Sequence, residues 1–394
     1  MDLQTLSNLF ATTFSPDPNV RKAGELDIRK VANEEGIITA LLQIIATDSV
    51  DPAIRQACTV WLKNRVITHY NPDKSTDRVP IAQSDRQSLK AAIFPLLSAV
   101  TSHGITVQLS NTLKTLVIND YPDNWPGLLG DVKRLLASSE VREVHAGCVA
   151  SLEIVRAFRF RQKSDILSGI VVELMPTLVQ IATQMLHSVS NASSNINPSS
   201  QEIPTMLHLI LKTYKTSIIV NLSTHQQSAD SLVPWGQLLF AVINFEVPQV
   251  AVPADEEERE RCEWWKVKKW AYGILFRLFH RYGNPSQLPS TMKKEYKTFA
   301  DHFVTMFAPE ILNIYLRQVE LFVSGRAWLS KKCQYQIFQF FTECVKPKST
   351  WKLLKPHFES LVSSFVFPQL SFTAAKEELW TNDPVDFVRT SVGE

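Results

Sequence analysis

Residues 36–70 read GIITALLQIIATDSVDPAIRQACTVWLKNRVITHY, and this stretch decides the fold. Its first part, Gly36 to Thr47, is apolar on nearly every side, which is typical of a helix buried on several faces. Asp51-Pro52 then combines an N-cap residue with a proline at the first helical position, so a second helix begins there. Apolar residues recur through this helix at helical spacing, namely Ile54, Ala57, Cys58, Trp61, Leu62 and Val66. A buried helix joined to an amphipathic helix by a short turn is an αα-hairpin.

The same hairpin recurs along the chain. The helical patterns pair in the ranges 2–14 with 18–32, 36–47 with 52–70, 85–102 with 105–120, 126–138 with 141–160, 165–187 with 202–221, 228–244 with 260–282, 292–324 with 329–345, and 351–372 with 374–392. The early pairs repeat at roughly the 40–47-residue period of HEAT repeats. Only 12 glycines occur in 394 residues, which disfavours a strand-rich fold with many tight turns. We therefore predict an all-α fold, a right-handed α-solenoid (superhelix) of about eight HEAT repeats.

The predicted repeats divide into two groups. Residues 1–160 hold repeats 1 to 4, and residues 161–394 hold repeats 5 to 8 with inserts at 188–201 and 246–260. The first insert is rich in Ser and Asn, and such a composition is typical of a flexible connection.

The second insert becomes acidic at Asp255, Glu256, Glu257 and Glu258. Carboxylates in a row fit the N-terminal end of a helix, where they interact favourably with the helix dipole. They also fit an acidic loop that meets a basic partner. Both interpretations stay open at this point.

Composition excludes several classes of protein. Lys plus Arg number 41 and Asp plus Glu number 39, so a net charge of +2 gives no global argument for binding nucleic acid or a membrane. The N-terminus lacks a basic start followed by an apolar run, and no uninterrupted apolar stretch approaches the length of a membrane span. The five cysteines are scattered, which is typical of reduced core residues in a cytosolic or nuclear protein.

No motif for catalysis is found. The sequence has no phosphate-binding or dinucleotide-binding glycine pattern, no C-x-x-C, no H-E-x-x-H and no recognisable nucleophile motif. The basic and aromatic residues of Arg156–Lys163 could contact RNA, but cations at a helix end also complement exposed carbonyls, and we favour that structural reading. We expect a binding protein, not an enzyme, without a metal site or a cofactor and without direct contact to nucleic acid or membrane.

A polar stripe follows the second helices of the early pairs. Gln108 and Thr112 lie on a different face from the apolar set that contains Leu109 and Leu113. With the polar residues of 55–63 they could form a row across repeats, and such a row on the concave side of a solenoid is a binding surface. A merely solvated face produces the same pattern.

Several blocks carry a specific pattern. They are Ile54-Arg55-Gln56-Ala57 with Leu62-Lys63-Asn64, Gln108-Leu109 with Asp120-Tyr121-Pro122 and Trp125, Trp264-Trp265-Lys266-Val267-Lys268-Lys269-Trp270, Trp351-Lys352 with Lys355-Pro356-His357, and Glu377-Glu378-Leu379-Trp380 with Asp383-Pro384, Phe387 and Arg389. The first two resemble the N-terminal domain of the importin-β superfamily. The later blocks are similar to the branch of importin-seven and importin-eight, and the exportin called CAS shares a looser form of the last one. The resemblance extends over essentially the whole chain.

The resemblance implies a superhelix in which first helices face outward and second helices face inward. Family members bind the GTP form of Ran through the inward helices of the first repeats, cargo on the inner surface and phenylalanine–glycine nucleoporins between outer helices. They shuttle between cytoplasm and nucleus at the nuclear envelope, and cargoes of this branch include basic proteins such as ribosomal proteins and histones. By position, the implied Ran contacts are Arg55, Gln56, Lys63, Asn64, Gln108 and Thr112, with Asp255, Glu256, Glu257 and Glu258 as a contact to Ran or cargo. Asn64 could equally cap a buried backbone group.

Three functions are open on this basis. The first is an importin whose cargo is released by RanGTP, the second a CAS-like exportin that binds cargo together with RanGTP, and the third a constitutive HEAT scaffold. The helix Arg55–Asn64 argues against the scaffold, because that pattern belongs to transport receptors. Family members are longer and more acidic than this chain, so we expect an N-terminal fragment.

Overall fold

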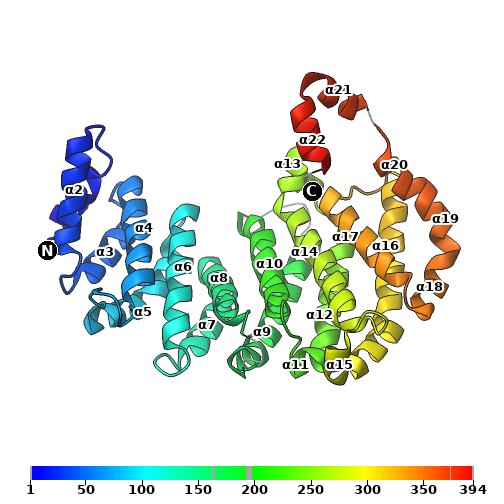
Figure 1. Ribbon diagram of the computed structural model, residues 1–394, viewed down its shortest axis with the longest axis horizontal. Coiled ribbons are helices and arrows are strands. Elements are labelled where there is room, and N and C mark those ends of the chain that lie inside the picture. The colour runs from blue at the N-terminus through cyan, green and yellow to red at the C-terminus, as the bar shows by residue number, and fades with distance from the viewer. Residues whose placement is uncertain (1, 162–164, 192–197, 373, 393–394) are drawn as a thin grey trace. The chain divides into compact units, whose positions relative to one another are not determined.

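The computed structural model describes residues 2–161, 165–191, 198–372 and 374–392 (Figure 1). Within these ranges every regular element is a helix and no strand occurs. The chain divides into two compact units, Met1–Phe245 and Glu246–Glu394. The predicted all-α fold of HEAT-type helix pairs is confirmed.

Unit 1 is a series of helix pairs. Its helices are α1 (Leu3–Thr12), α2 (Pro18–Val31), α3 (Ile37–Ala46), α4 (Pro52–His69), α5 (Gln83–Ala99), α6 (His103–Asp120), α7 (Leu128–Leu136), α8 (Val141–Phe158), α9 (Asp165–Asn191), α10 (Pro198–Ser217), α11 (Thr224–Gln227) and α12 (Ala229–Asn244). Of the predicted insert 188–201, residues 188–191 continue α9 and residues 198–201 begin α10, while residues 192–197 lie outside the described part of the chain.

The pairs of unit 1 build two layers. The second helices pack successively, α4 against α6, α6 against α8 and α8 against α10, and Figure 1 shows them as a row. The first helices form the other layer, in which α1 packs against α3, α3 against α5, and α9 against α7 and α12. Helix α8 contacts α5, α6, α7, α9 and α10, so its residues from Ala146 to Val155 are all buried.

Capping contacts fix the helices of unit 1 to each other. The Asp51 carboxylate accepts a hydrogen bond from the Ala53 N–H at 2.7 Å, as predicted for the start of α4. Helix α3 has no side-chain cap of its own, because its N-cap residue is Gly36, which lies in the left-handed region at φ 86° and carries no side chain. Instead, Asp85 of α5 accepts from the backbone N–H groups of Gly36 and Thr39, each at 3.0 Å.

Helix α9 is long and apolar. By length and a mean hydropathy of 1.7, residues 165–190 match a membrane span, the one such helix within the described ranges. Its apolar residues are not uninterrupted, because polar residues such as Glu173 and Gln180 lie among them. The helix nevertheless packs against α7, α8, α10 and α12, with Leu174, Met175 and Leu178 fully buried. In this structure it packs within the repeat stack, with 39% of its apolar window buried.

Unit 2 begins with short elements and continues with longer helices. Its elements are η1 (Gln249–Ala251), α13 (Glu256–Arg261), α14 (Glu263–Arg277), η2 (Leu278–Gly283), α15 (Ser290–His302), η3 (Phe303–Phe307), α16 (Ala308–Val323), α17 (Lys331–Cys344), α18 (Lys348–Leu354), η4 (Lys355–His357), α19 (Phe358–Leu361), η5 (Val362–Val366), α20 (Phe367–Leu370), α21 (Ala374–Asn382) and α22 (Pro384–Val392). The segments η2, η3 and η5 are π-helical, so the helix predicted over 292–324 is α15, η3 and α16 in succession.

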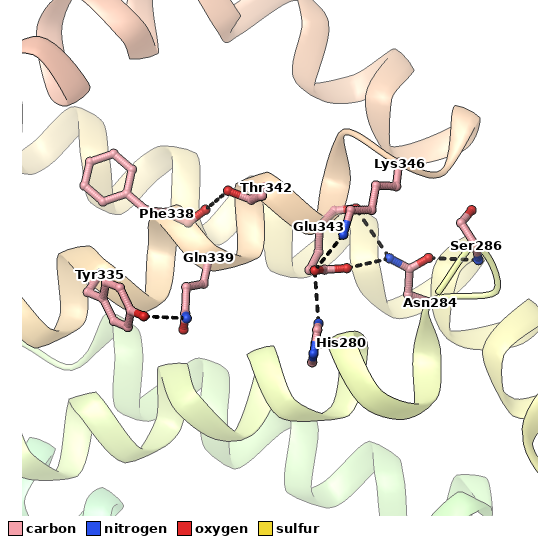
Figure 2. A network of polar contacts seen from close by, with 9 residues as sticks. All are labelled: His280, Asn284, Ser286, Tyr335, Phe338, Gln339, Thr342, Glu343 and Lys346. Atoms are coloured by element: carbon pink, nitrogen blue, oxygen red, sulfur yellow. Dashed lines mark hydrogen bonds and ion pairs between the residues drawn. The ribbon is translucent and has the colours of Figure 1, made fainter. Parts of the chain in front are cut away.

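A buried carboxylate joins two helices of unit 2. Glu343, near the end of α17, has a side chain only 6% exposed. It accepts hydrogen bonds from His280 Nδ1 at 3.0 Å, Asn284 Nδ2 at 2.9 Å and Lys346 Nζ at 3.2 Å (Figure 2). Since His280 belongs to η2 and Asn284 follows it, this network fixes the end of α14–η2 against α17.

Candidate functional site

A groove opens between the second helices of the first two pairs, and we call it the α2–α4 groove. Its volume is about 560 Å³. It is lined by Phe10, Thr13 and Phe14 at the end of α1, by Glu25, Ile28 and Arg29 of α2, and by Ala53, Gln56, Ala57, Val60, Trp61 and Asn64 of α4. Most of these side chains are apolar, and the polar ones are Thr13 at the end of α1, Glu25 and Arg29 of α2, and Gln56 and Asn64 of α4.

The floor of the groove is aromatic. Phe10 is 2% exposed and meets the ring of Trp61 edge to face, with centroids 6.2 Å apart. Phe14, one turn further on, is 53% exposed. The groove therefore combines a rigid buried base with an accessible aromatic side chain, a combination that favours binding of an apolar group.

Glycines set two of the close approaches around the groove. A Cβ on Gly24 would lie 1.9 Å from Thr12 Oγ1, so α1 and α2 approach each other here only because residue 24 has no side chain. A Cβ on Gly104 would lie 2.8 Å from Gln56 Oε1. Gln56 therefore lies both in the groove and against the start of α6.

Three of the predicted contact residues lie together on α4. Gln56 and Lys63 are half-buried and Asn64 is exposed. Gln56 and Asn64 both line the groove, and Lys63 is the residue next to Asn64. Among the described residues no hydrogen bond joins the Asn64 side chain to a buried backbone group, so the capping interpretation gains no support.

Two other predicted residues have structural contacts instead. Arg55 Nε donates to the Ile45 carbonyl at 2.9 Å and its guanidinium pairs with Asp48 at 2.9 Å, so it holds the end of α3. Thr112 is fully buried, and its hydroxyl donates to the Gln108 carbonyl at 3.0 Å. These polar groups are bonded within the fold, and a contact of either residue with Ran stays a prediction.

Helix α6 satisfies most of its own polar side chains. Asn111 donates to the Val107 carbonyl at 3.0 Å, Thr115 to the Asn111 carbonyl at 3.1 Å, and Asn119 to the Thr115 carbonyl at 2.8 Å. Such bonds to the preceding turn compete with bonds to a partner. Gln108 is half-buried on this helix and remains a contact residue by position.

The segment that follows α6 has a structural role. Asp120 is 7% exposed, accepts from the Tyr70 hydroxyl at 2.5 Å and pairs with Lys90 at 2.8 Å. Burial, and then the Asp120 carboxylate, raise the pKa of the Tyr70 hydroxyl. Trp125 is 8% exposed and packs on Phe94, with centroids 5.8 Å apart. This block of the sequence therefore joins α4, α5 and α6.

The predicted acidic loop is a short helix in unit 2. Asp255 is its N-cap and accepts from the Glu258 N–H at 2.8 Å, while Glu256, Glu257 and Glu258 form the exposed first turn of α13. This geometry agrees with the helix N-terminal interpretation. A contact of these carboxylates with Ran or cargo stays a prediction.

Sequence reasoning missed the apolar part of the groove. Phe10 and Phe14 are four residues apart, and Val60 and Trp61 lie on the same helix as the predicted polar contacts. These spacings indicate buried faces in any helical hairpin. Only the structure shows that Phe14 remains open to solvent.

The comparisons with known proteins agree with this fold. Residues 24–99 match the family described as the Importin-beta N-terminal domain, and this range contains most of α2, the whole of α4 and α5. Thus the matched range includes most of the groove lining.

Curated relatives match along nearly the whole chain. Nonsense-mediated mRNA decay protein 5 of Saccharomyces cerevisiae is 28% identical over 100% of this chain and 38% of its own length. Importin-8 of Danio rerio is 27% identical over 95% of this chain and 36% of its own length. An Importin beta-like SAD2 homolog of Arabidopsis thaliana is 29% identical over 99% of this chain and 36% of its own length. The chain thus spans little more than a third of these relatives.

Two solved structures share the fold. The exportin Cse1 in its cargo-free, cytoplasmic state matches with a TM-score of 0.76 at 15% identity, over 99% of this chain and 40% of that one. Lph2, a bidirectional nuclear transport receptor of Saccharomyces cerevisiae, matches with a TM-score of 0.59 at 15% identity, over 98% of this chain and 38% of that one. Taken together, residues 24–99 match the N-terminal domain of the importin-β family, and the chain is similar along nearly its whole length to importin-8 and its relatives.

Proposed function

We propose that this chain is part of a nuclear transport receptor that binds the GTP form of Ran with the second helices of its first repeats. The observation that carries the proposal is that Gln56 and Asn64 of α4 line an open apolar groove. Lys63 is half-buried on the same helix, next to Asn64. The amides supply hydrogen-bond groups, Lys63 supplies a positive charge, and Phe14 supplies apolar area. An interface with an apolar centre and a polar rim has this composition.

The proposed Ran-binding region corresponds to residues 1–160, with repeats 5 to 8 in residues 161–394. Gln108 extends the polar contacts from α4 to α6. As an importin, the receptor would bind basic cargo such as ribosomal proteins or histones in the cytoplasm. RanGTP would release that cargo in the nucleus, and contacts with phenylalanine–glycine nucleoporins would carry the complex through the pore between the two compartments.

Cargo release by Ran is a linkage effect. Two ligands that exclude each other lower each other's affinity by the same factor, whatever the order of binding. The import proposal therefore predicts that the GTP form of Ran displaces cargo. The export alternative, which the structural similarity to Cse1 favours, predicts that Ran and cargo strengthen each other's binding.

Binding of the purified chain to Ran tests the proposal. Ran loaded with a non-hydrolysable GTP analogue should bind much more tightly than Ran loaded with GDP. Lys63→Glu should weaken the GTP form about tenfold, or about 1.4 kcal/mol. The matched control is Lys22→Glu. It reverses the charge of an exposed residue of α2 that does not line the groove. Equal affinity for both nucleotide forms would contradict the proposal.

A second measurement separates import from export. A histone dimer serves as a basic cargo probe, and its affinity is measured with and without the GTP form of Ran. Loss of histone binding on addition of Ran supports import, and a gain supports the exportin alternative. A histone affinity that does not respond to bound Ran favours the constitutive scaffold.

A further inference from the structure

Cationic side chains follow the exposed side of two neighbouring helices of unit 2. On α14, Lys266 and Lys269 lie three residues apart. On α17, Lys332, Tyr335, Gln339 and Thr342 follow each other at spacings of three or four residues, which places them on one side of the helix. Lys346 continues this spacing two residues after the helix ends at Cys344. Figure 2 shows Tyr335, Gln339 and Thr342 along α17, with Lys346 just beyond its end. We call Lys266, Lys269, Lys332, Tyr335 and Lys346 the α14–α17 basic face.

The two rows lie close together because α14 packs against α17. Partial burial lowers the pKa of Lys269, and the positive charges of Lys332 and Lys266 lower it further, with Glu263 acting in the opposite direction. Like charges held close together destabilise the folded chain. An acidic ligand would remove that repulsion.

The carboxylates of Glu263 and Glu343, near the face, already form ion pairs with lysines of the face. Glu263 pairs with Lys266 at 2.6 Å, and the buried Glu343 pairs with Lys346 at 3.2 Å. Among the described residues, no ion pair involves Lys269 or Lys332. Lys269 instead lies over the ring of Trp270, 5.6 Å from its centroid. Two cations of the face are therefore available to a partner.

An exposed aromatic ring lies between the cations. Tyr335 is 58% exposed, and Gln339 Nε2 donates to its hydroxyl at 2.8 Å, which fixes the direction of the ring (Figure 2). Tyrosine beside cationic side chains is the composition of a protein-binding surface.

We propose that the α14–α17 basic face binds a short acidic segment of a partner protein. From Lys332 to Lys346 the face is about 21 Å long at the rise of an α-helix. An extended peptide of about six residues covers that length. This partner is distinct from the Ran and basic-cargo contacts proposed above.

The surroundings favour a short acidic peptide over nucleic acid. Helix α13 packs at the start of α14, and its Glu260 accepts a hydrogen bond from the backbone N–H of Lys331 at the start of α17. Its exposed carboxylates Glu256, Glu257 and Glu258 therefore lie beyond one end of the basic face. A long polyanion would extend into these negative charges, whereas a segment of six residues would not.

The test uses a fluorescein-labelled hexaglutamate peptide, the full chain and fluorescence anisotropy at low salt. We expect saturable binding that Lys269→Glu with Lys332→Glu weakens at least tenfold. The matched control is Lys293→Glu with Lys294→Glu, two exposed lysines on α15 of the same unit, which should change the affinity less than twofold. Tyr335→Ala, which alters no charge, should weaken binding about threefold.

Three outcomes would overturn the proposal: no saturable binding of hexaglutamate, an equal loss in the control variant, or tighter binding of a six-nucleotide oligo-dT that the same double variant abolishes. The last result would assign the face to nucleic acid. Thermal unfolding followed by circular dichroism checks that each variant is folded. Because the assay contains no Ran, its failure is independent of the proposed transport function.

Discussion

Asp85 caps helix α3 from 49 residues further along the chain, since its carboxylate accepts the backbone N–H of the N-cap residue Gly36 at 3.0 Å. The same side chain accepts both the N–H and the hydroxyl of Thr39, and it is 1% exposed. Helix α3 thus depends on the next repeat for its N-terminal cap. The contact couples the folding of the second repeat to that of the third.

Asp85→Ala should therefore lower the free energy of unfolding by about 1–3 kcal/mol, because it leaves two partly buried N–H donors without their acceptor. Urea unfolding followed by circular dichroism measures the change. The control is Asp77→Ala, at an exposed residue in the connection between α4 and α5, and it should stay within about 0.5 kcal/mol of the parent. Equal losses in the two variants would contradict the capping role.

Tyr70→Phe should cost about 1–2 kcal/mol, because Asp120 loses its shortest hydrogen bond. The pKa of Tyr70 is raised in the folded chain, so the unfolded chain releases this proton first, near pH 10. The stability that Tyr70 contributes is complete below that pH and is lost as the pH rises above it. Urea unfolding at pH 9 to 11 should show a smaller loss in Tyr70→Phe than in the parent chain.

Lys268 gives the opposite dependence on pH. Burial lowers the pKa of its amine to about 8 from 10.5, so between these values the unfolded chain holds a proton that the folded chain lacks. Stability must rise with pH across that window, by up to roughly 3 kcal/mol. The free energy of unfolding of Lys268→Met, measured by urea unfolding between pH 8 and 10.5, should not show this rise. If the parent and the variant changed equally with pH, burial would not lower the pKa of Lys268.

The α2–α4 groove can be tested with a charge in place of an exposed aromatic ring. Phe14→Asp should weaken binding of RanGTP at least tenfold, since an ionised carboxylate in an apolar contact costs more than the 1.4 kcal/mol that a factor of ten requires. Leu26→Asp is the matched control: Leu26 is 47% exposed on α2 and does not line the groove. A similar loss in both variants would remove the groove from the Ran-binding site.

Substitutions in the hydrogen-bond network around Glu343 should lower the stability of the chain by different amounts. Glu343→Ala removes the acceptor for the buried amide of Asn284 and should cost about 2–3 kcal/mol. His280→Ala should cost less, because half of the His280 side chain is exposed and water can replace it. Glu320→Ala, which breaks an exposed ion pair with Arg326, should cost under about 1 kcal/mol. Thermal unfolding of the three variants gives the order.

The helix pairs were predictable because local signals agree with each other. At Asp51-Pro52 the cap, the proline and the apolar period all indicate the start of one helix, and α4 begins at Pro52. The π-helical segments were not predictable from periodicity. Over 292–324 the apolar pattern is that of one continuous α-helix, whereas residues Phe303–Phe307 form the π-helical segment η3.

The contact residues were less predictable, because neighbouring positions on a helix differ in burial by small rotations. Gln108 and Thr112 are one turn apart and both polar, yet only Thr112 is fully buried. The partner of Arg55 is the carbonyl of Ile45, whose position depends on the turn between α3 and α4. Periodicity gives the face of a helix but not what packs against its edge.

The absent side chain at Gly24 has a consequence for how the groove could diverge. A methyl group at this position would displace the Thr12 hydroxyl, which donates to the Leu9 carbonyl at 2.6 Å, and would force α1 away from α2. Phe10 and Phe14 would move with α1 and change the width of the opening. A single substitution at a residue that does not line the groove would thus change the size of the partner side chain that fits into it, while every lining residue stayed the same.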